Sequence, residues 1–263
     1  MELVEIEKSI IKKYRKKIFV PFVKAIKEFN LIEENDKIAV CISGGKDSFL
    51  LAKCMQEIKK HGKFNFDLEF VVMNPGYSEE NINKIKENLN ILGINAHIFE
   101  SPIFNVADTT DNPCYMCAKM RRGYLYSYAK KIGCNKIALG HHFDDVIETV
   151  LLNMIFNGNF SSMVPKVKSD NFENMELIRP LYYVREESIK SWTRYNELTF
   201  LDCACSVTKK NSGQRLVIKN LVKQLNEIYS KADVNIMTST KKVNLNTLLG
   251  YKQGDKYYSK YED

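Results

Sequence analysis

The chain has 263 residues, which is enough for one large α/β domain with helical additions. Its composition, 44% hydrophobic and 27% charged, is that of an ordinary globular protein, and no apolar run approaches the ~20 residues of a membrane-spanning helix. The formal net charge of +7 favours contact with polyanions, although a lysine-rich composition alone would also produce it.

The N-terminus mixes charge throughout and lacks the apolar stretch of a secretory signal. We therefore expect a cytoplasmic protein whose seven cysteines stay reduced and, where they cluster, serve metal binding or catalysis. Residues 3–30 place apolar side chains at helical spacing and include the basic run "KKYRKK". Residues 1–30 are thus predicted to form a basic helical segment, whose candidate RNA-binding residues are Lys12, Lys13, Arg15, Lys16 and Lys17.

The middle of the chain alternates short apolar runs with helical patterns. Strands are predicted at 37–42, 68–75, 94–100, 134–140 and 176–184, and helices at 48–62, 78–93, 118–133, 143–158 and 186–197. This alternation predicts an α/β fold with a Rossmann-like parallel sheet, which binds ligands beyond the carboxyl ends of its strands. We assign residues 31–205 to this catalytic domain and 206–263 to a C-terminal helical segment with a polar tail.

The stretch "SGGKDS" follows the first predicted strand and opens a helix. Its glycines let backbone amides approach an anion at the positive end of the helix, and a lysine adds charge. The loop is not a Walker A motif, because Val40 occupies the position of that motif's first glycine. A plain glycine turn is the alternative, but the strand–loop–helix context favours a phosphate site. The candidate binding residues are Ser43, Gly44, Gly45, Lys46, Asp47 and Ser48.

With these residues the chain resembles the PP-loop, or ATP-pyrophosphatase, family, whose motif is SGGxDS. The resemblance implies that ATP is cleaved between its α and β phosphates and that AMP is attached to an oxygen of the substrate. The loop would then hold the pyrophosphate portion, with Lys46 as a catalytic residue.

A second motif, "GHHFDD", follows the fourth predicted strand. Asp144 and Asp145 begin a helix, which one of them could cap. Two carboxylates beside two histidines and a phosphate loop indicate Mg²⁺ rather than a transition metal. We expect Asp47 and Asp145 to bind magnesium, and the resemblance makes Asp145 catalytic. Further candidates for ATP binding are Asn74, Gly140 and His141.

The pair Cys114 and Cys117 has CxxC spacing, which alone fits a zinc knuckle, a redox pair or an iron–sulfur cluster. Zinc would need a second pair, and Cys203 with Cys205 offers one at the less usual CxC spacing. A cluster held by three cysteines would leave one iron open to hold sulfur. The other cysteines, Cys41, Cys54 and Cys134, fall in predicted strands or helices and are expected in the core.

The stretch from Cys114 to Lys166, together with "IRPLYYVREESI" at 178–189, is similar to the tRNA 2-thiocytidine synthetase family. This resemblance spans roughly residues 30 to 190. It implies a [4Fe–4S] cluster on Cys114, Cys117 and a third cysteine, for which we prefer Cys203 over Cys205.

The resemblance also implies that the C2 oxygen of a tRNA cytidine, at position 32, is adenylated and then replaced by sulfur. Arg121 corresponds to a basic catalytic residue of related enzymes, and Arg122 is expected to bind RNA. The partners considered are tRNA, a sulfur donor (a cysteine desulfurase or free sulfide) and a second copy of the chain. The alternatives are a tRNA 2-thiouridine synthetase, a PP-loop ligase without sulfur chemistry, and a zinc-stabilised ATP-binding module without turnover.

Overall fold

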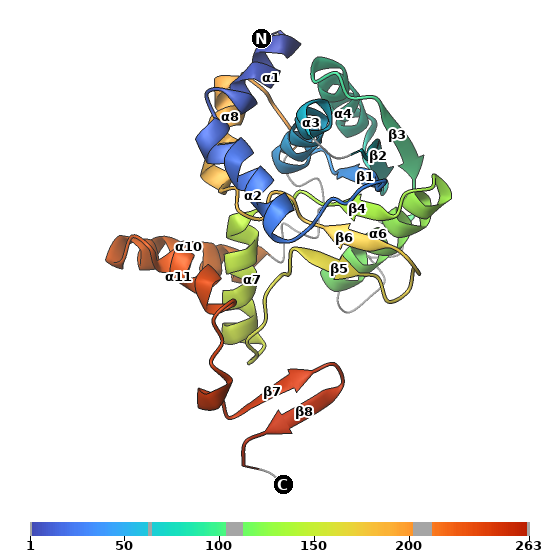
Figure 1. The fold of residues 1–263 in the computed structure, drawn as a ribbon. Coiled ribbons are helices and arrows are strands. Elements are labelled where there is room, and N and C mark those ends of the chain that lie inside the picture. The colour runs from blue at the N-terminus through green and yellow to red at the C-terminus, as the bar shows by residue number, and fades with distance from the viewer. Residues whose placement is uncertain (1, 63–64, 104–112, 202–211, 262–263) are drawn as a thin grey trace. The chain divides into compact units, whose positions relative to one another are not determined.

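The computed structural model describes residues 2–62, 65–103, 113–201 and 212–261 (Figure 1). The chain divides into two compact units. The first consists of Met1–Val146 with Met163–Gln214, and the second of Ile147–Ser162 with Arg215–Asp263. The predicted division at residues 30 and 205 stays a prediction.

The first unit is built on a six-stranded sheet with the order β3-β2-β1-β4-β6-β5. The strands are β1 Lys37–Ile42, β2 Asp67–Asn74, β3 Ala96–Glu100, β4 Lys136–Ala138, β5 Lys166–Lys168 and β6 Glu176–Ile178. All neighbours pair in parallel except β5, which runs antiparallel to β6. The predicted α/β fold with a mostly parallel, Rossmann-like sheet is therefore confirmed.

The strand predicted over 176–184 is wrong beyond Ile178. There the chain turns, because Pro180 lacks a backbone N–H and has a fixed φ that suits the second position of a turn. The turn is closed by a hydrogen bond from Tyr182 N to Arg179 O of 3.2 Å. The antiparallel strand β5 was not predicted at all.

The helices that accompany this sheet follow the predicted pattern. They are α1 Leu3–Ile11, the π-helix η1 Arg15–Phe19, α2 Val20–Glu28, α3 Lys46–His61, α4 Glu79–Ile91, α6 Pro113–Lys131, α7 Phe143–Phe156 and α8 Glu186–Tyr195. Helix α6 begins at Pro113 rather than after the cysteine pair as predicted, because proline is favoured at the first position of a helix. Both cysteines of the CxxC pair thus belong to its opening turns.

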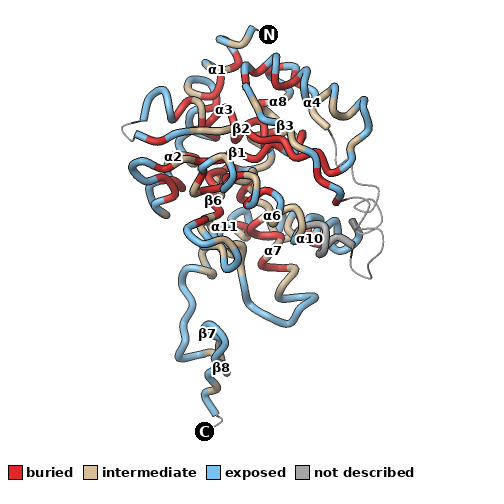
Figure 2. Tube along the Cα trace, turned by 90° about the vertical axis from the view of Figure 1, so that its right-hand side faces the viewer, coloured by how far each residue is buried: buried red, intermediate tan, exposed pale blue. Residues whose placement is uncertain are grey.

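The core of the first unit lies against the sheet, where β1 and β2 are buried over most of their length (Figure 2). Cys41, Cys54 and Cys134 are buried and free, which confirms their predicted place in the core. Burial raises the pKa of the Cys134 thiol to about 11 and raises those of the other two as well. These three thiols are therefore protonated at neutral pH and poor metal ligands.

The N-terminal helices are anchored to α8 by buried polar contacts. Trp192 is fully buried, and its indole Nε1 donates to Ser9 Oγ at 3.0 Å. Tyr14 Oη donates to the backbone oxygen of Ser191 at 2.8 Å. If the N-terminal helices were separated from α8, both hydrogen bonds would break and their polar atoms would be left unsatisfied in the core. The basic helical segment thus packs within the first unit.

The described part of the second unit contains the later part of α7, two α-helices, a short 3₁₀-helix and a hairpin. Its elements are α10 Ser212–Ile228, which enters it at Arg215, α11 Ala232–Ser239, the short 3₁₀-helix η2 Leu245–Thr247, β7 Gly250–Gln253 and β8 Lys256–Ser259. The hairpin falls in the stretch predicted to be a polar tail, and the rings of Tyr251 and Tyr258 stack across it at 4.9 Å. None of the described helices is both long and apolar enough to cross a membrane.

Candidate active site

The loop between β1 and α3 presents backbone amides at the start of a helix. Gly44 has a φ of +92°, a conformation that glycine adopts without strain. The Ser48 hydroxyl accepts from Ser43 N at 3.1 Å and donates to Gly45 O at 2.8 Å, so it holds the loop in shape. No side chain caps α3 at Gly45, and its first N–H groups can therefore receive an anion.

Gly140 brings the second motif against this loop. A Cβ atom at Gly140 would lie 3.0 Å from Ser48 N and 3.1 Å from the carbonyl carbon of Asp47. Only glycine allows so close an approach between the turn after β4 and the start of α3. The strands β1 and β4 are neighbours, and the order of the sheet reverses between them, which is where such folds bind ligands. The structure thus brings the two predicted motifs together.

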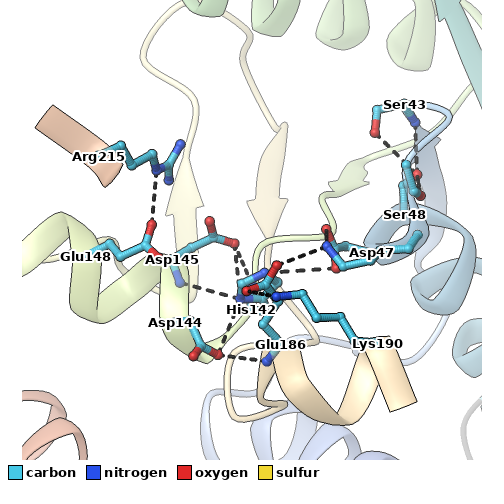
Figure 3. A network of polar contacts seen from close by, with 12 residues as sticks. Ser43, Asp47, Ser48, His142, Asp144, Asp145, Glu148, Glu186, Lys190 and Arg215 are labelled. Atoms are coloured by element: carbon cyan, nitrogen blue, oxygen red, sulfur yellow. Dashed lines mark hydrogen bonds and ion pairs between the residues drawn. The ribbon is translucent and has the colours of Figure 1, made fainter. Parts of the chain in front are cut away.

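A buried histidine connects the carboxylates of the two motifs (Figure 3). His142 Nε2 lies 3.9 Å from Asp47 Oδ1, and His142 Nδ1 lies 3.4 Å from Asp145 Oδ2 and 3.7 Å from Asp144 Oδ2. Asp145 Oδ2 also accepts from His142 N at 3.0 Å at the start of α7. Asp144 instead accepts from Glu186 N at 2.7 Å, at the start of α8.

His142 was given no role in the sequence prediction, which selected His141. The only signal for it in the sequence is the second histidine of the motif. Its Nδ1 accepts from Asp145 N at 3.4 Å, so His142 belongs to the polar network that links the two motifs.

The environment of the site shifts the pKa of Asp47. Burial raises the pKa of Asp47, although His142 and Lys46 oppose the shift. Its Oδ1 atom is buried and has no hydrogen-bond partner among the described residues. A buried carboxylate oxygen without a partner is costly, so a cation placed there would stabilise the site.

Lys46 is paired with carboxylates from two elements. Its Nζ lies 3.2 Å from Asp47 Oδ2 and 3.2 Å from Glu186 Oε1, while Glu186 also pairs with Lys190 at 3.0 Å. Burial lowers the pKa of Lys46, but the two carboxylates outweigh this and raise it above its ordinary value. Lys46 is therefore fully charged at neutral pH. Glu186 is a site residue that the sequence prediction missed.

Asn74 shapes the neighbouring turn at the end of β2. Its Oδ1 accepts from the backbone N–H groups of Tyr77 at 2.7 Å and Gly76 at 3.1 Å, and its Nδ2 donates to Glu100 at 3.0 Å. The Tyr77 hydroxyl in turn donates to Ser43 O at 3.3 Å. Asn74 thus lies at the same edge of the sheet as the phosphate loop, but its side chain is engaged within the protein.

His141 faces the other side of the turn, toward a residue that was not predicted. Arg179, directly after β6, donates from Nε to His141 Nδ1 at 3.3 Å. Arg121 and Arg122 lie on α6, where Arg121 is half-buried and Arg122 is exposed.

The predicted cluster ligands are only partly within the described part of the chain. Cys114 and Cys117 are in α6 with side chains that the structure does not describe, and Cys203 and Cys205 lie outside the described residues. The backbone leading to Cys203 is placed, because Leu201 N donates to Gly44 O at 3.1 Å. The rings of Phe200 and Phe49 stack at 5.1 Å beside it. The described chain therefore contacts the phosphate loop two residues before Cys203, the predicted third ligand.

The candidate RNA-binding residues of the basic run are all exposed. Tyr14 and Ile18, which alternate with these cations in the sequence, are buried. The basic run therefore packs through its apolar side chains and presents its cations to solvent. Lys13 Nζ lies 3.3 Å from the ring centroid of Tyr195, a cation–π contact with α8. Among the described residues, including those of this site, no group of three or more His, Cys, Asp or Glu side chains could hold a metal ion.

Comparisons with known proteins agree with this geometry. A family model described as a PP-loop domain matches residues 14–225. A tRNA-cytidine(32) 2-sulfurtransferase from Alcanivorax borkumensis is 37% identical over 225 residues, which are 83% of this chain and 78% of the relative. Another enzyme of that name, from Geobacter metallireducens, is 38% identical over 218 residues, covering 81% of this chain and 84% of the relative.

A similar fold is found in a solved structure, the U34-tRNA thiolase NcsA from Methanococcus maripaludis with its [4Fe–4S] cluster. The TM-score is 0.68 at 22% sequence identity, and the match covers 89% of this chain and 80% of NcsA. At this identity the likeness concerns the fold alone.

Proposed function

Because this chain belongs to the tRNA-cytidine(32) 2-sulfurtransferases, a family of PP-loop enzymes, we propose that it uses ATP to convert a tRNA cytidine to 2-thiocytidine. The predicted family and the prediction of an enzyme are thereby confirmed. The target that we propose is position 32, the position named for the relatives. The observation that carries the proposal is the packing of Gly140 on Asp47 and Ser48, because it joins the two motifs in one site.

In the first step the C2 oxygen of the cytidine attacks the α-phosphate of ATP, and the bond to the pyrophosphate group breaks. The uncapped N-terminus of α3 would hold the pyrophosphate oxygens through its N–H groups. Lys46 would exchange its contact with Glu186 for these oxygens and stabilise the charge that develops on them. Asp145, held by His142, would keep the reacting groups aligned.

Magnesium fits the residues of this site. Asp47 Oδ1, which has no hydrogen-bond partner among the described residues, and the nearby Asp145 could provide two carboxylate ligands. Mg²⁺ in nucleotide sites commonly takes one or two carboxylates and completes its shell with phosphate oxygens and water. A site of this kind needs no third protein ligand, and the ion would neutralise charge on the ATP phosphates.

In the second step sulfur attacks C2, the bond between C2 and the adenylated oxygen breaks, and AMP leaves. We propose that Cys114, Cys117 and Cys203, or Cys205 in place of Cys203, hold a [4Fe–4S] cluster near the nucleotide. The hydrogen bond between Leu201 and Gly44 supports this, since Cys203 is only two positions after Leu201 in the sequence. When bound, the cluster would supply an iron without a protein thiolate that carries the sulfur.

The remaining predicted residues would bind the RNA. Arg121 would act on the reacting centre, while the exposed basic run at 12–17 and Arg122 would contact phosphates. ATP binding by Asn74 and His141, the sulfur donor and a homodimer stay predictions.

Nucleoside analysis of tRNA by mass spectrometry tests this proposal. A strain that lacks the gene should lose 2-thiocytidine, and expression of the intact chain should restore it. An unchanged 2-thiocytidine content together with loss of 2-thiouridine would favour the uridine alternative instead. Purified protein that binds stoichiometric zinc and releases no pyrophosphate would favour the ATP-binding module without turnover.

A further inference from the structure

Arg179 lies where β4 and β6 end side by side. Ile178 pairs with Ala138, and Leu139 N donates to Ile178 O at 3.0 Å, so Arg179 stands beside the turn of the second motif. Its Nε donates to His141 Nδ1 at 3.3 Å, and its Nη1 donates to Val164 O at 2.5 Å. The acceptors are an imidazole nitrogen and a backbone carbonyl, so neither supplies a negative charge to compensate the guanidinium.

No carboxylate among the described residues forms an ion pair with Arg179. Burial, followed by the like charge of Arg122, lowers the pKa of Arg179 to about 10, while Tyr126, Tyr182 and Asp145 act in the opposite direction. Arg179 therefore stays charged at neutral pH. A partly buried cation beside a second cation is unfavourable unless an anion joins them.

Arg122 lies in the middle of α6, the helix that precedes β4. It is exposed and forms no hydrogen bond or ion pair with a described residue, and Tyr126 lies one turn further along the same face of the helix. Burial raises the pKa of Tyr126, and the charges of Arg179 and Arg122 both oppose that shift. Tyr126 belongs to the same buried cluster as Leu177 of β6, which is two residues before Arg179. The helix face that carries Tyr126 and Arg122 therefore packs toward the strand that ends at Arg179, and the two cations are available to one ligand.

We propose that Arg179 and Arg122 together bind a phosphate group of a substrate. The planar guanidinium fork matches phosphate oxygens, and two such groups suit a phosphate better than a carboxylate. This phosphate is distinct from the one at Ser43–Ser48, because β6 lies two strands from β1, about 10 Å away. The inference rests on the proposed function, whose two substrates, ATP and tRNA, are the two sources of phosphate.

Binding assays on the full-length protein can test this pair. Arg122→Gln and Arg179→Gln should each weaken binding of one substrate about tenfold, the usual scale for one charge-assisted contact. Arg179→Lys should recover part of the loss, because it keeps the charge but not the fork. Lys131→Gln is the matched control, since Lys131 is an exposed cation at the far end of α6.

The two ligands to measure are Mg²⁺–ATP and the tRNA substrate, each over a series of salt concentrations. Weaker ATP binding assigns the pair to a phosphate of the nucleotide. Weaker RNA binding, with a log–log salt slope reduced by a little under one, assigns it to the RNA backbone. Arg122→Gln alters an exposed side chain, so it remains informative if Arg179→Gln does not fold.

Wild-type affinity for both ligands in Arg122→Gln and in a folded Arg179 variant would overturn the phosphate pair and leave the proposed function intact. A wild-type protein that binds neither ligand would overturn both.

Discussion

Substitution of Gly140 by alanine tests whether contact between the two motifs is needed for turnover. The added methyl group would lie 3.0 Å from Ser48 N and 3.1 Å from both Asp47 C and Ser48 Cα. All three are backbone atoms, which cannot rotate away as a side chain can. The start of α3 must therefore move by a few tenths of an ångström, and the expected cost in folding free energy is about 1–3 kcal/mol.

The same movement separates the α3 N-terminus from Asp145. A misplacement of about 1 Å can cost 10²-fold in rate, so a shift of this size should lower pyrophosphate release by about tenfold. Each kcal/mol should lower the melting temperature by about 2–4 °C in a chain of this size, which differential scanning fluorimetry can measure. A tRNA-dependent pyrophosphate assay gives the rate.

Gly123→Ala is the matched control. A Cβ atom at Gly123, within α6, would meet nothing within 4 Å, and alanine favours a helix by about 1 kcal/mol over glycine. This variant should melt at the same or a higher temperature and keep its activity. The reasoning is refuted if Gly140→Ala matches Gly123→Ala in both melting temperature and rate.

Three further changes test separate parts of the site. Lys46→Ala should lower pyrophosphate release by about 10²–10³-fold in a tRNA-dependent assay, because it removes the cation facing the leaving group, and bound iron should be unchanged. Of Cys203→Ala and Cys205→Ala, only the variant that removes a ligand should lose iron and sulfide on anaerobic reconstitution; full iron in both would exclude a third ligand from this pair. Charge reversal across the basic run at 12–17 should weaken tRNA binding and its salt dependence but leave ATP affinity unchanged; an unaltered salt slope would place the RNA surface elsewhere.

The strands and helices of the first unit could be predicted because their ends carry strong local signals. The run "KIAVCI" is followed closely by two glycines, α3 ends directly before Gly62, and α4 ends two residues before Gly93. The motifs were also placed correctly, since consecutive parallel strands end at the same edge of a sheet. Local sequence patterns were sufficient for features that depend on residues close together in the sequence.

Contacts between distant residues could not be predicted in this way. Arg179 was missed because "ELIRPLYYV" reads as one continuous apolar strand, although Pro180 turns the chain and leaves Arg179 beside His141. Glu186 was missed because its importance depends on Lys46, which is 140 positions away in sequence but 3.2 Å away in space. The hairpin β7–β8 was missed because its exposed tyrosines and lysines form no buried apolar face.

The hydrogen bond between Leu201 and Gly44 couples two halves of the proposed chemistry. The carbonyl that accepts this bond belongs to the residue whose positive φ shapes the nucleotide loop. If nucleotide binding or release changes the conformation of this loop, the change would therefore reach the backbone two residues before Cys203. By linkage, occupancy at either site then alters affinity at the other to the same degree. The ratio of the nucleotide affinities measured with and without bound iron would give the size of this coupling.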